Sequence, residues 1–409
     1  MISVETAQAF VLTGLGPLEP ASLDLDDALG CVVAEPVVAR ESIPGFANSS
    51  MDGFALRAQD TATGSARLTI VDAIMAGDVS ATTLGAGQAI RIMTGAPVPN
   101  GADAICPIED VIVEETTLRV ERVVDVGACV RYPGDDVTAG QLLLAPGTTL
   151  DAAAIAVLAG QGLTSVVVHR RPRVGVLSTG NELARSSDPL APGQIRDSNR
   201  PLLLALVREA GCAAVDLGVA ADTYDEIRRR LADGVATCDA VISTGGVSVG
   251  DLDHVKHVIG ELGGPSARSM QVAIKPGKPF AYGLVGPDRR PLFGLPGNPV
   301  STRVGFELFV RPALRTLAGH AVIERLRLRA TLDVALDRRP DGKLHLVHVR
   351  AEVDLDGVVH VRDVARQGSH LVHAVVGANA IALLPDGATF AVGDTVEIIV
   401  LDADRLGAP

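Results

Sequence analysis

The sequence predicts a multidomain α/β protein with a central, doubly wound and mainly parallel α/β domain, a small inserted β domain and a C-terminal β domain. The first observation is size, because 409 residues, 47% of them hydrophobic, are enough for about two to four separate cores. The second is that residues 170–320 alternate apolar β runs with helical patterns, which is typical of a parallel sheet covered on both faces. The third is that short β-branched runs between Gly, Pro and Asn turns fill residues 45–139 and 323–403.

The residues before the α/β region show helical patterns on both sides of a β-rich stretch. Residues 3–13 carry apolar side chains at helical spacing, and a second helical pattern returns at 150–160. We therefore predict that the β-rich stretch is inserted into an outer domain built from both flanks. The predicted domains are a discontinuous outer domain (1–44 and 140–169), an inserted β domain (45–139), an α/β domain (170–320) and a C-terminal domain (321–409) that is a small barrel or sandwich.

The overall charge limits the classes of partner. A formal net charge of -13 and a pI near 5.1 argue against a nucleic-acid or anionic-membrane surface, so an anionic ligand needs a local basic pocket. Five cysteines without a CxxC pair predict buried, reduced thiols. The opening residues lack a signal-peptide pattern, and no apolar stretch reaches the about 18 residues of a membrane span. We expect a cytoplasmic protein.

The first motif that carries chemistry is Ser243-Thr-Gly-Gly-Val-Ser-Val-Gly-Asp-Leu-Asp253, where a strand ends and a helix begins. Glycines let backbone N–H groups approach a phosphate, hydroxyls add donors, and a helix N-terminus favours negative charge. Asp251 and Asp253 either cap the helix or bind a divalent metal that offsets the phosphate charge. Glu182 follows a similar Ser178-Thr-Gly-Asn turn on the same sheet edge. The candidate phosphate-binding residues are Thr244, Gly245, Gly246 and Ser248.

Two lysines flank a Pro-Gly turn in Ala273-Ile-Lys-Pro-Gly-Lys-Pro279. One explanation is a turn with exposed charges. The other is an oxyanion clamp, because Lys275 and Lys278 supply flexible donors on a backbone that prolines fix. The segment Gly294-Leu-Pro-Gly-Asn-Pro-Val-Ser301 opens a helix with a further anion-receptive turn. Four such loops predict that the α/β domain binds an anionic, phosphate-bearing small molecule.

Other polar residues carry weaker signals. Ser50-Met-Asp-Gly-Phe-Ala55, Met93-Thr-Gly-Ala-Pro97 and Arg131-Tyr-Pro-Gly-Asp-Asp136 lie at turns, which turn chemistry alone explains. Five of the nine histidines lie in the C-terminal domain, among them His345 and His348. In a strand these two rings point to opposite faces, so we expect no histidine metal site there, and no cysteine has an activating neighbour for nucleophilic catalysis.

Together and in this order, these motifs resemble the molybdopterin molybdenumtransferase family, prokaryotic enzymes related to the E domain of gephyrin. The resemblance covers nearly the whole chain. The segments that carry it are residues 48–55, 93–97, 178–183, 197–199, 243–256, 274–280 and 295–301.

The resemblance implies an elongated homodimer whose α/β domain binds molybdopterin and whose C-terminal domain is a β barrel. It implies that molybdate and adenylylated molybdopterin give molybdenum cofactor and AMP, with Mg²⁺ required, in the final step of molybdenum cofactor biosynthesis. The molybdopterin adenylyltransferase and the molybdoenzymes that accept the cofactor are the partners that it suggests.

Roles follow by motif position. Residues of the inserted domain would reach the α/β site of the partner subunit: Asp52, Thr94, Arg131 and Asp136. Catalytic roles are implied for Glu182, Asp222, Asp253 and Lys275, metal binding for Asp251 and Asp253, and contacts with the pterin for Lys278, Pro296 and Pro299. Arg350 in His-Val-Arg and Ser369 in Gln-Gly-Ser would face the lysines and, with Ser301, hold molybdate. One departure is Ala221-Asp222, where the family often has two acidic residues.

Two other functions stand beside this one. The adenylyltransferase that activates molybdopterin resembles the α/β region in fold, but the additional domains argue against it. A scaffold or cofactor carrier without catalysis is the second, against which the carboxylates and lysines at motif positions argue.

Overall fold

The computed structural model describes residues 1–184, 187, 189–246, 254–336, 340–364, 366 and 368–407. The chain divides into two compact units. The larger unit contains Met1–Ala34, Pro146–Asp151 and Ser165–Pro409, and the smaller one contains Glu35–Ala145 and Ala152–Thr164. The smaller unit is therefore an insertion within the sequence of the larger one.

The smaller unit is mainly β structure. Among its described residues, six strands form a sheet in the order β8-β5-β7-β6-β10-β9, with β6 and β7 parallel and the other pairs antiparallel. Gly53 is required in β5 because a Cβ there would lie 2.2 Å from the Cys106 carbonyl oxygen on β8. The predicted inserted β domain is confirmed. Its strands are β5 (Gly53–Leu56), β6 (Ala66–Ile74), β7 (Gln88–Ile92), β8 (Ala104–Pro107), β9 (Val111–Glu114) and β10 (Thr117–Val120).

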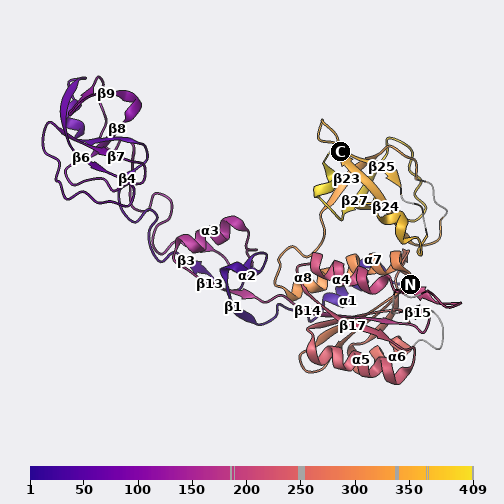
Figure 1. The fold of residues 1–409 in the computed structure, drawn as a ribbon. Helices are drawn as coiled ribbons and strands as arrows, with labels where there is room; N and C mark the ends of the chain where they lie inside the picture. The colour runs from indigo at the N-terminus through magenta and orange to yellow at the C-terminus, as the bar shows by residue number, and fades with distance from the viewer. Residues whose placement is uncertain are drawn as a thin grey trace. The chain divides into compact units, whose positions relative to one another are not determined.

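The larger unit contains the predicted α/β domain. Its described strands have the order β17-β14-β18-β22-β21-β19, in which the first four run parallel and β21 pairs antiparallel with both β22 and β19. Helices α5 and α6 cover one face of the sheet, and α1, α4, α7 and α8 lie on the other (Figure 1). The sheet is therefore doubly wound, as predicted. The strands are β14 (Arg173–Thr179), β17 (Ala213–Ala220), β18 (Ala240–Thr244), β19 (Arg268–Gln271), β21 (Pro279–Val285) and β22 (Arg290–Leu295); the helices are α4 (Asn199–Glu209), α5 (Tyr224–Thr237), α6 (His254–Gly263), α7 (Pro299–Gly305) and α8 (Arg311–Leu317).

The first helix belongs to the core of this α/β domain. Helix α1 (Val4–Leu12) begins after Ser3, whose hydroxyl accepts a hydrogen bond from the Thr6 N–H at 3.2 Å. Its apolar face is buried against the sheet, and the Tyr282 hydroxyl donates to the Val11 carbonyl oxygen at 2.9 Å. A separate sheet follows, built from β1 (Pro20–Asp24), β13 (Ser165–His169) and β2 (Val32–Val33).

The C-terminal domain is a closed β barrel. Of the two architectures predicted from the sequence, barrel and sandwich, the barrel is confirmed. In the described part of the chain, five strands pair in the cycle β24-β25-β23-β27-β26, and β26 returns to β24. The short strand β20 (Ile274–Lys275) from the lysine segment adds to the barrel by pairing in parallel with β24. The barrel strands are β23 (Arg327–Leu332), β24 (Leu344–Val353), β25 (Val359–Val364), β26 (Ala380–Leu384) and β27 (Thr395–Val400).

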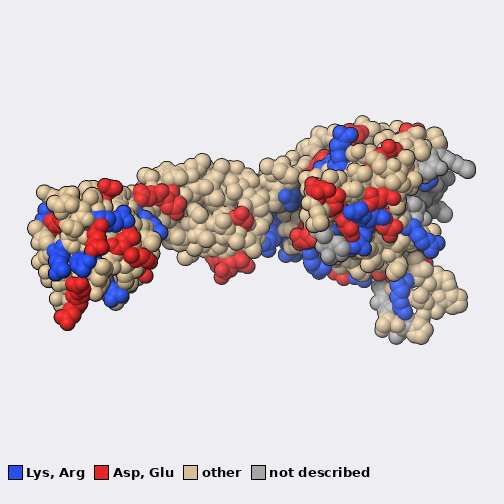
Figure 2. All heavy atoms as spheres, turned by 90° about the horizontal axis from the view of Figure 1, so that it is seen from above, with Lys and Arg blue, Asp and Glu red and all other residues tan. Residues whose placement is uncertain are grey.

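Charged residues are spread over the surface rather than gathered in one area. Figure 2 shows acidic and basic side chains interspersed on the face of the described residues seen there. No helix in the described ranges is long and apolar enough to cross a membrane. The positive charge that an anionic ligand needs therefore has to come from a local pocket.

A buried ion pair fixes the helix that follows the segment 294–301. The π-helical turn Phe306–Val310 lies between α7 and α8, and its Glu307 is only 5% exposed. Arg325 donates to the two Glu307 oxygens at 2.9 and 3.0 Å and to the Leu401 carbonyl oxygen at 2.6 Å. This pair links α7 to the end of the barrel.

Glu307→Ala should lower the free energy of unfolding by about 3–5 kcal/mol, because it leaves the Arg325 charge in the interior without its partner. Urea denaturation followed by circular dichroism measures the change. Glu324→Ala is the matched control, since Glu324 makes a surface pair with Arg327 at 3.5 Å, and it should cost less than about 1 kcal/mol. Equal losses in the two variants would contradict the role given to the buried pair.

Candidate functional site

The carboxyl ends of β14, β18 and β22 meet at one edge of the sheet, where ligands bind in folds of this kind. Thr244 ends β18, and its buried hydroxyl donates to the Pro296 carbonyl oxygen at 3.1 Å. The Asn199 side-chain amide donates to the Thr244 hydroxyl at 3.0 Å and to the Gly297 carbonyl oxygen at 2.6 Å. The structure therefore brings together the predicted residues Thr244 and Pro296, with Asn199 holding both segments.

The glycines of this edge are required by the backbone. Gly245 and Gly246 have left-handed φ values of +93° and +63°. A Cβ at Gly245 would also lie 2.6 Å from the Thr179 carbonyl oxygen, so only glycine fits. Within the described residues, Ser243 Oγ and Asn199 Oδ1 are buried without a hydrogen-bond partner. Such orphaned atoms are typical of a site where ligand or water supplies the partner.

Two of the predicted carboxylates lie on neighbouring loops. Glu182 and Asp222 are both exposed, and the Asp222 N–H donates to Asn181 Oδ1 at 3.0 Å, which ties their loops together. Pro299 is the first residue of α7, where a proline costs no hydrogen bond. The predicted residues Ser248, Asp251 and Asp253 lie outside the described residues, and the choice between helix cap and metal ligand remains a prediction.

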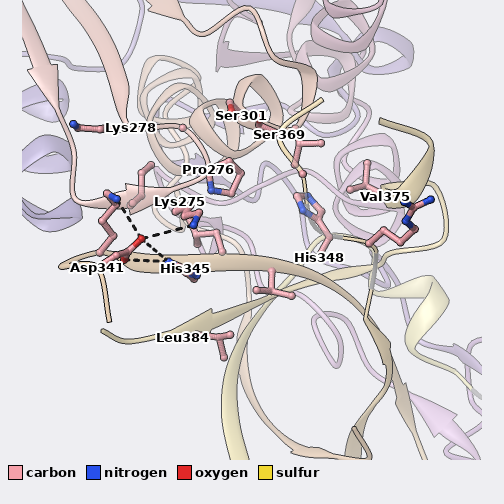
Figure 3. A pocket seen from close by; sticks show the side chains of 18 of the residues that line it. Lys275, Pro276, Lys278, Ser301, Asp341, His345, His348, Ser369, Val375 and Leu384 are labelled. Atoms are coloured by element: carbon pink, nitrogen blue, oxygen red, sulfur yellow. Dashed lines mark hydrogen bonds and ion pairs between the residues drawn. The ribbon is translucent and has the colours of Figure 1, made fainter. Parts of the chain in front are cut away.

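The lysine segment lines a cavity of about 790 Å³ in the larger unit (Figure 3). Four of the five residues that were predicted to meet there line it, namely Lys275, Lys278, Ser301 and Ser369, whereas Arg350 does not. Backbone bonds hold the serine loop in place, because the Val300 N–H donates to the Ser369 carbonyl oxygen and the Asn298 amide donates to Ser369 Oγ, both at 3.0 Å. Polar residues that the sequence analysis did not predict also line it: Asp341, Lys343, His345, His348 and Arg366.

One carboxylate organises the cations of this cavity. Asp341 Oδ2 lies 3.2 Å from Lys343 Nζ and 3.8 Å from Lys275 Nζ, and Asp341 Oδ1 lies 3.1 Å from His345 Nε2 (Figure 3). Partial desolvation, the largest effect, raises the pKa of Asp341, but the bonds from His345 and Lys343 outweigh it and bring the pKa to about 2. Asp341 is therefore ionised at neutral pH and offsets part of the positive charge around it.

The structure does not bring Arg350 to the cavity. Its side chain is 52% exposed and pairs with Glu352 at 2.6 Å, and it is not among the described residues that line the cavity. The pairing of β24 with β25 is irregular between Arg350 and Ala351, and such an irregularity turns a side chain away from its regular direction. Strand β24 contributes His348 instead.

Strand β24 contributes two histidines to the cavity. His345 and His348 both lie on β24 and both line the cavity. Residues 346–349 are all buried, because this strand is covered on both sides. The described residues contain no group of three or more His, Cys, Asp or Glu side chains that could hold a metal.

The smaller unit holds its predicted residues in ordered turns. Asp52 Oδ1 accepts from both the Thr94 N–H and the Thr94 hydroxyl at 2.7 Å. The bond from the Thr94 backbone, followed by that from its hydroxyl, lowers the pKa of Asp52. Arg131 lies exposed on β11 (Val130–Arg131), and the N–H of the exposed Asp136 donates to the Ile43 carbonyl oxygen at 3.0 Å. Asp52 and Thr94 thus form one polar unit on the surface.

Comparison with known proteins matches the chain along its length. Residues 2–162 match the MoeA N-terminal region (domain I and II), 175–316 a probable molybdopterin binding domain, and 329–401 the MoeA C-terminal region (domain IV). The molybdopterin molybdenumtransferase of Staphylococcus epidermidis is 34% identical over 98% of this chain and 96% of that protein. The Bacillus subtilis protein of the same name is 36% identical over 92% of this chain and 89% of that protein.

The chain belongs to the molybdopterin molybdenumtransferase family. The solved structure of the molybdopterin biosynthesis moeA protein of Pyrococcus horikoshii agrees, with a TM-score of 0.81, 27% identity, and coverage of 98% of this chain and 100% of that one. Membership confirms the resemblance drawn from the motifs. The N-terminal and C-terminal regions of the chain also match this family. The alternative function, an adenylyltransferase that consists of the α/β domain alone, is therefore wrong for this chain.

Two of the cavity residues that the sequence analysis missed, His345 and His348, carried a signal in the sequence. The C-terminal domain of this family member is rich in histidine, and those rings were considered only as metal ligands. The structure places His345 and His348 in the same cavity wall as Lys275. Only the pairing of β20 with β24, which places Lys275 opposite His345, shows this.

Asp341→Asn should raise the affinity of this family member for molybdate about fivefold, because it removes a negative charge that competes with the anion for Lys275 and His345. Isothermal titration calorimetry at neutral pH measures this. Asp288→Asn removes a charge from an exposed carboxylate that pairs with Arg290 and should leave the affinity unchanged. Weaker binding by Asp341→Asn would mean that the carboxylate is needed to position the cations.

Proposed function

We propose that this protein transfers molybdenum from molybdate onto adenylylated molybdopterin, releases AMP and so forms the molybdenum cofactor. The transferase activity follows from sequence similarity over nearly the whole chain to proteins named molybdopterin molybdenumtransferase. The chain is an enzyme of the final step of molybdenum cofactor biosynthesis, and residues 175–316 form its molybdopterin-binding domain. The observation that supports this chemistry is the cavity that Lys275, Lys278, Ser301 and Ser369 line together.

The cavity is the oxyanion end of the proposed site. Two ammonium groups and two hydroxyls supply charge and donors for a tetrahedral dianion. Gly277 keeps the lysine turn close to α7, because its φ is +103° and a Cβ there would lie 3.4 Å from the Ser301 carbonyl oxygen. Lys275 and Lys278 therefore bind molybdate and hold it against the site where the adenylyl bond breaks.

The sheet edge is the nucleotide and pterin end. The left-handed turn that Gly245 and Gly246 form after Thr244 gives a phosphate room to approach the backbone, and Glu182 and Asp222 lie on the adjoining loops. The segment 294–301 connects the two ends, since the Pro296 carbonyl oxygen accepts from Thr244 and Ser301 lines the cavity. We infer that one long ligand spans both ends, with its adenylate at the sheet edge.

Magnesium is part of the proposal, with Asp251 and Asp253 as its ligands. The described residues offer no three-donor cluster for a metal. Mg²⁺ is commonly held by one or two carboxylates together with substrate phosphates and water, and Asp251 and Asp253 would be these carboxylates. When bound, Mg²⁺ would neutralise phosphate charge beside the Gly245 turn.

We further propose that the protein works as a cytoplasmic homodimer. Asp52, Thr94, Arg131 and Asp136 of the smaller unit would complete the sheet-edge site of the partner subunit, as the family resemblance implies. The five free cysteines agree with a reducing compartment. The adenylyltransferase that supplies adenylylated molybdopterin and the molybdoenzymes that accept the product are the expected partners.

Lys275→Ala and Lys278→Ala should each weaken molybdate binding at least about tenfold while leaving the unfolding midpoint nearly unchanged, since exposed ion pairs contribute little to stability. Calorimetric titration of the folded variants with molybdate checks this. Arg329→Ala is the control, because it removes an exposed cation from β23 outside the cavity. Parent affinity in both lysine variants would remove the oxyanion clamp from the proposal.

Mixing an Asp52→Ala subunit with an Asp253→Ala subunit should recover about a quarter to a half of the parent activity, if each site takes residues from both subunits. Molybdate-dependent release of AMP from adenylylated molybdopterin is the assay, and each parent variant alone should be at least about tenfold slower than the wild type. A mixed dimer as inactive as its parents argues against shared sites. Absence of AMP release from the wild type would leave only the scaffold function.

A further inference from the structure

The wall of the cavity contains a histidine with one ring nitrogen that has no partner among the described residues. His348 on β24 is 2% exposed and lines the cavity with Ser301 and Ser369 (Figure 3). Across the described part of the chain, its Nε2 is buried with no hydrogen-bond partner. A buried polar atom without a partner is unfavourable, and in native proteins it commonly marks a place for a ligand or an ordered water.

The ring is neutral in this environment. Burial, and after it the positive charge of Arg303 on α7, lowers the pKa of His348 to about 3. A neutral imidazole offers one N–H donor and one acceptor nitrogen. The other charged or titratable groups on the cavity wall are Lys275, Lys278, Asp341, Lys343, His345 and Arg366.

The position matters because β24 was expected to contribute a cation. Arg350, the residue expected from the motif, is directed to Glu352 and does not line the cavity. Strand β24 therefore contributes the neutral His348 to the cavity, and not the guanidinium of Arg350 that the motif predicts. The charge for the anion comes from the lysines opposite.

We propose that His348 is a further molybdate-binding residue, which donates a hydrogen bond to the oxyanion as a neutral imidazole and fixes its orientation without adding charge. The inference rests on the proposed function and adds a residue to its oxyanion end. A donor fixed by burial loses little freedom on binding, so it orients the anion at a small entropic cost. Because it brings no additional charge, it also limits ground-state affinity, which favours release of product.

Calorimetric titration of the full-length protein with molybdate at pH 7.5 tests the inference. His348→Phe keeps the ring volume and removes both nitrogens, and it should weaken binding at least about tenfold, equivalent to ~1.4 kcal/mol. His348→Gln keeps a neutral donor and should bind within about threefold of the wild type. His360→Phe is the control, because His360 belongs to the same barrel and contacts Asp333 at 2.8 Å and Asp354 at 3.1 Å outside the cavity; its molybdate affinity should not change.

A second readout tests the neutral form. Titrations in two buffers of different ionisation enthalpy report the protons taken up on binding, and wild type and His348→Gln should take up the same number. A proton uptake that disappears in His348→Gln would overturn the neutral imidazole, and parent affinity in His348→Phe would overturn the contact. Equally weak binding by the Phe and Gln variants, both folded by circular dichroism, would also overturn it.

The two proposals fail in different ways. If the wild type binds molybdate and the lysine variants lose affinity while His348→Phe does not, only the role of His348 is wrong. If the wild type binds no molybdate, or Lys275→Ala and Lys278→Ala bind as the wild type does, the oxyanion end itself is wrong.

Discussion

The short parallel pairing of β20 with β24 is the interaction on which the cavity depends. Ile274 lies opposite Leu344 and Lys275 opposite His345, and the Leu344 N–H donates to the Ala273 carbonyl oxygen at 2.9 Å. Ile274 is 1% exposed and shares an apolar core with residues of the barrel. Because this core joins barrel and sheet, the lysines of one and the polar residues of the other face the same space.

In the proposed site, an acidic protein binds an anion through a local group of cations. The chain carries a net charge of -13, yet its lysine and histidine side chains gather around one cavity, with Asp341 among them. The carboxylate holds Lys343 and His345 in place before a ligand arrives. The same carboxylate also offsets part of their charge, so it competes with an anion for these side chains.

The segment 294–301 sets the distance between the two ends of the site. Thr302 Oγ1 donates to the Pro296 carbonyl oxygen at 2.6 Å, the same oxygen that accepts from Thr244. This oxygen joins the sheet edge to the first turn of α7, and the ion pair of Glu307 with Arg325 fixes the far end of that helix. A rigid spacer of this kind suits a ligand with an anion at each end, since both anions are then held at a fixed separation.

The sequence by itself determined the doubly wound sheet, the inserted β domain, and the residues of the glycine and lysine turns, because these depend on local patterns. Gly245 is predicted to belong to a phosphate-binding loop because a left-handed backbone favours glycine, whichever residues surround it. Only the tertiary structure decided that the last domain closes as a barrel, that His348 rather than Arg350 faces the lysines, and that Asp341 lies between the cations. Strand alternation gives the side of a strand but not what covers it, and β24 is covered on both sides. Which residues meet across a cavity is set by long-range pairing, here that of β20 with β24, and no local pattern in the sequence specifies it.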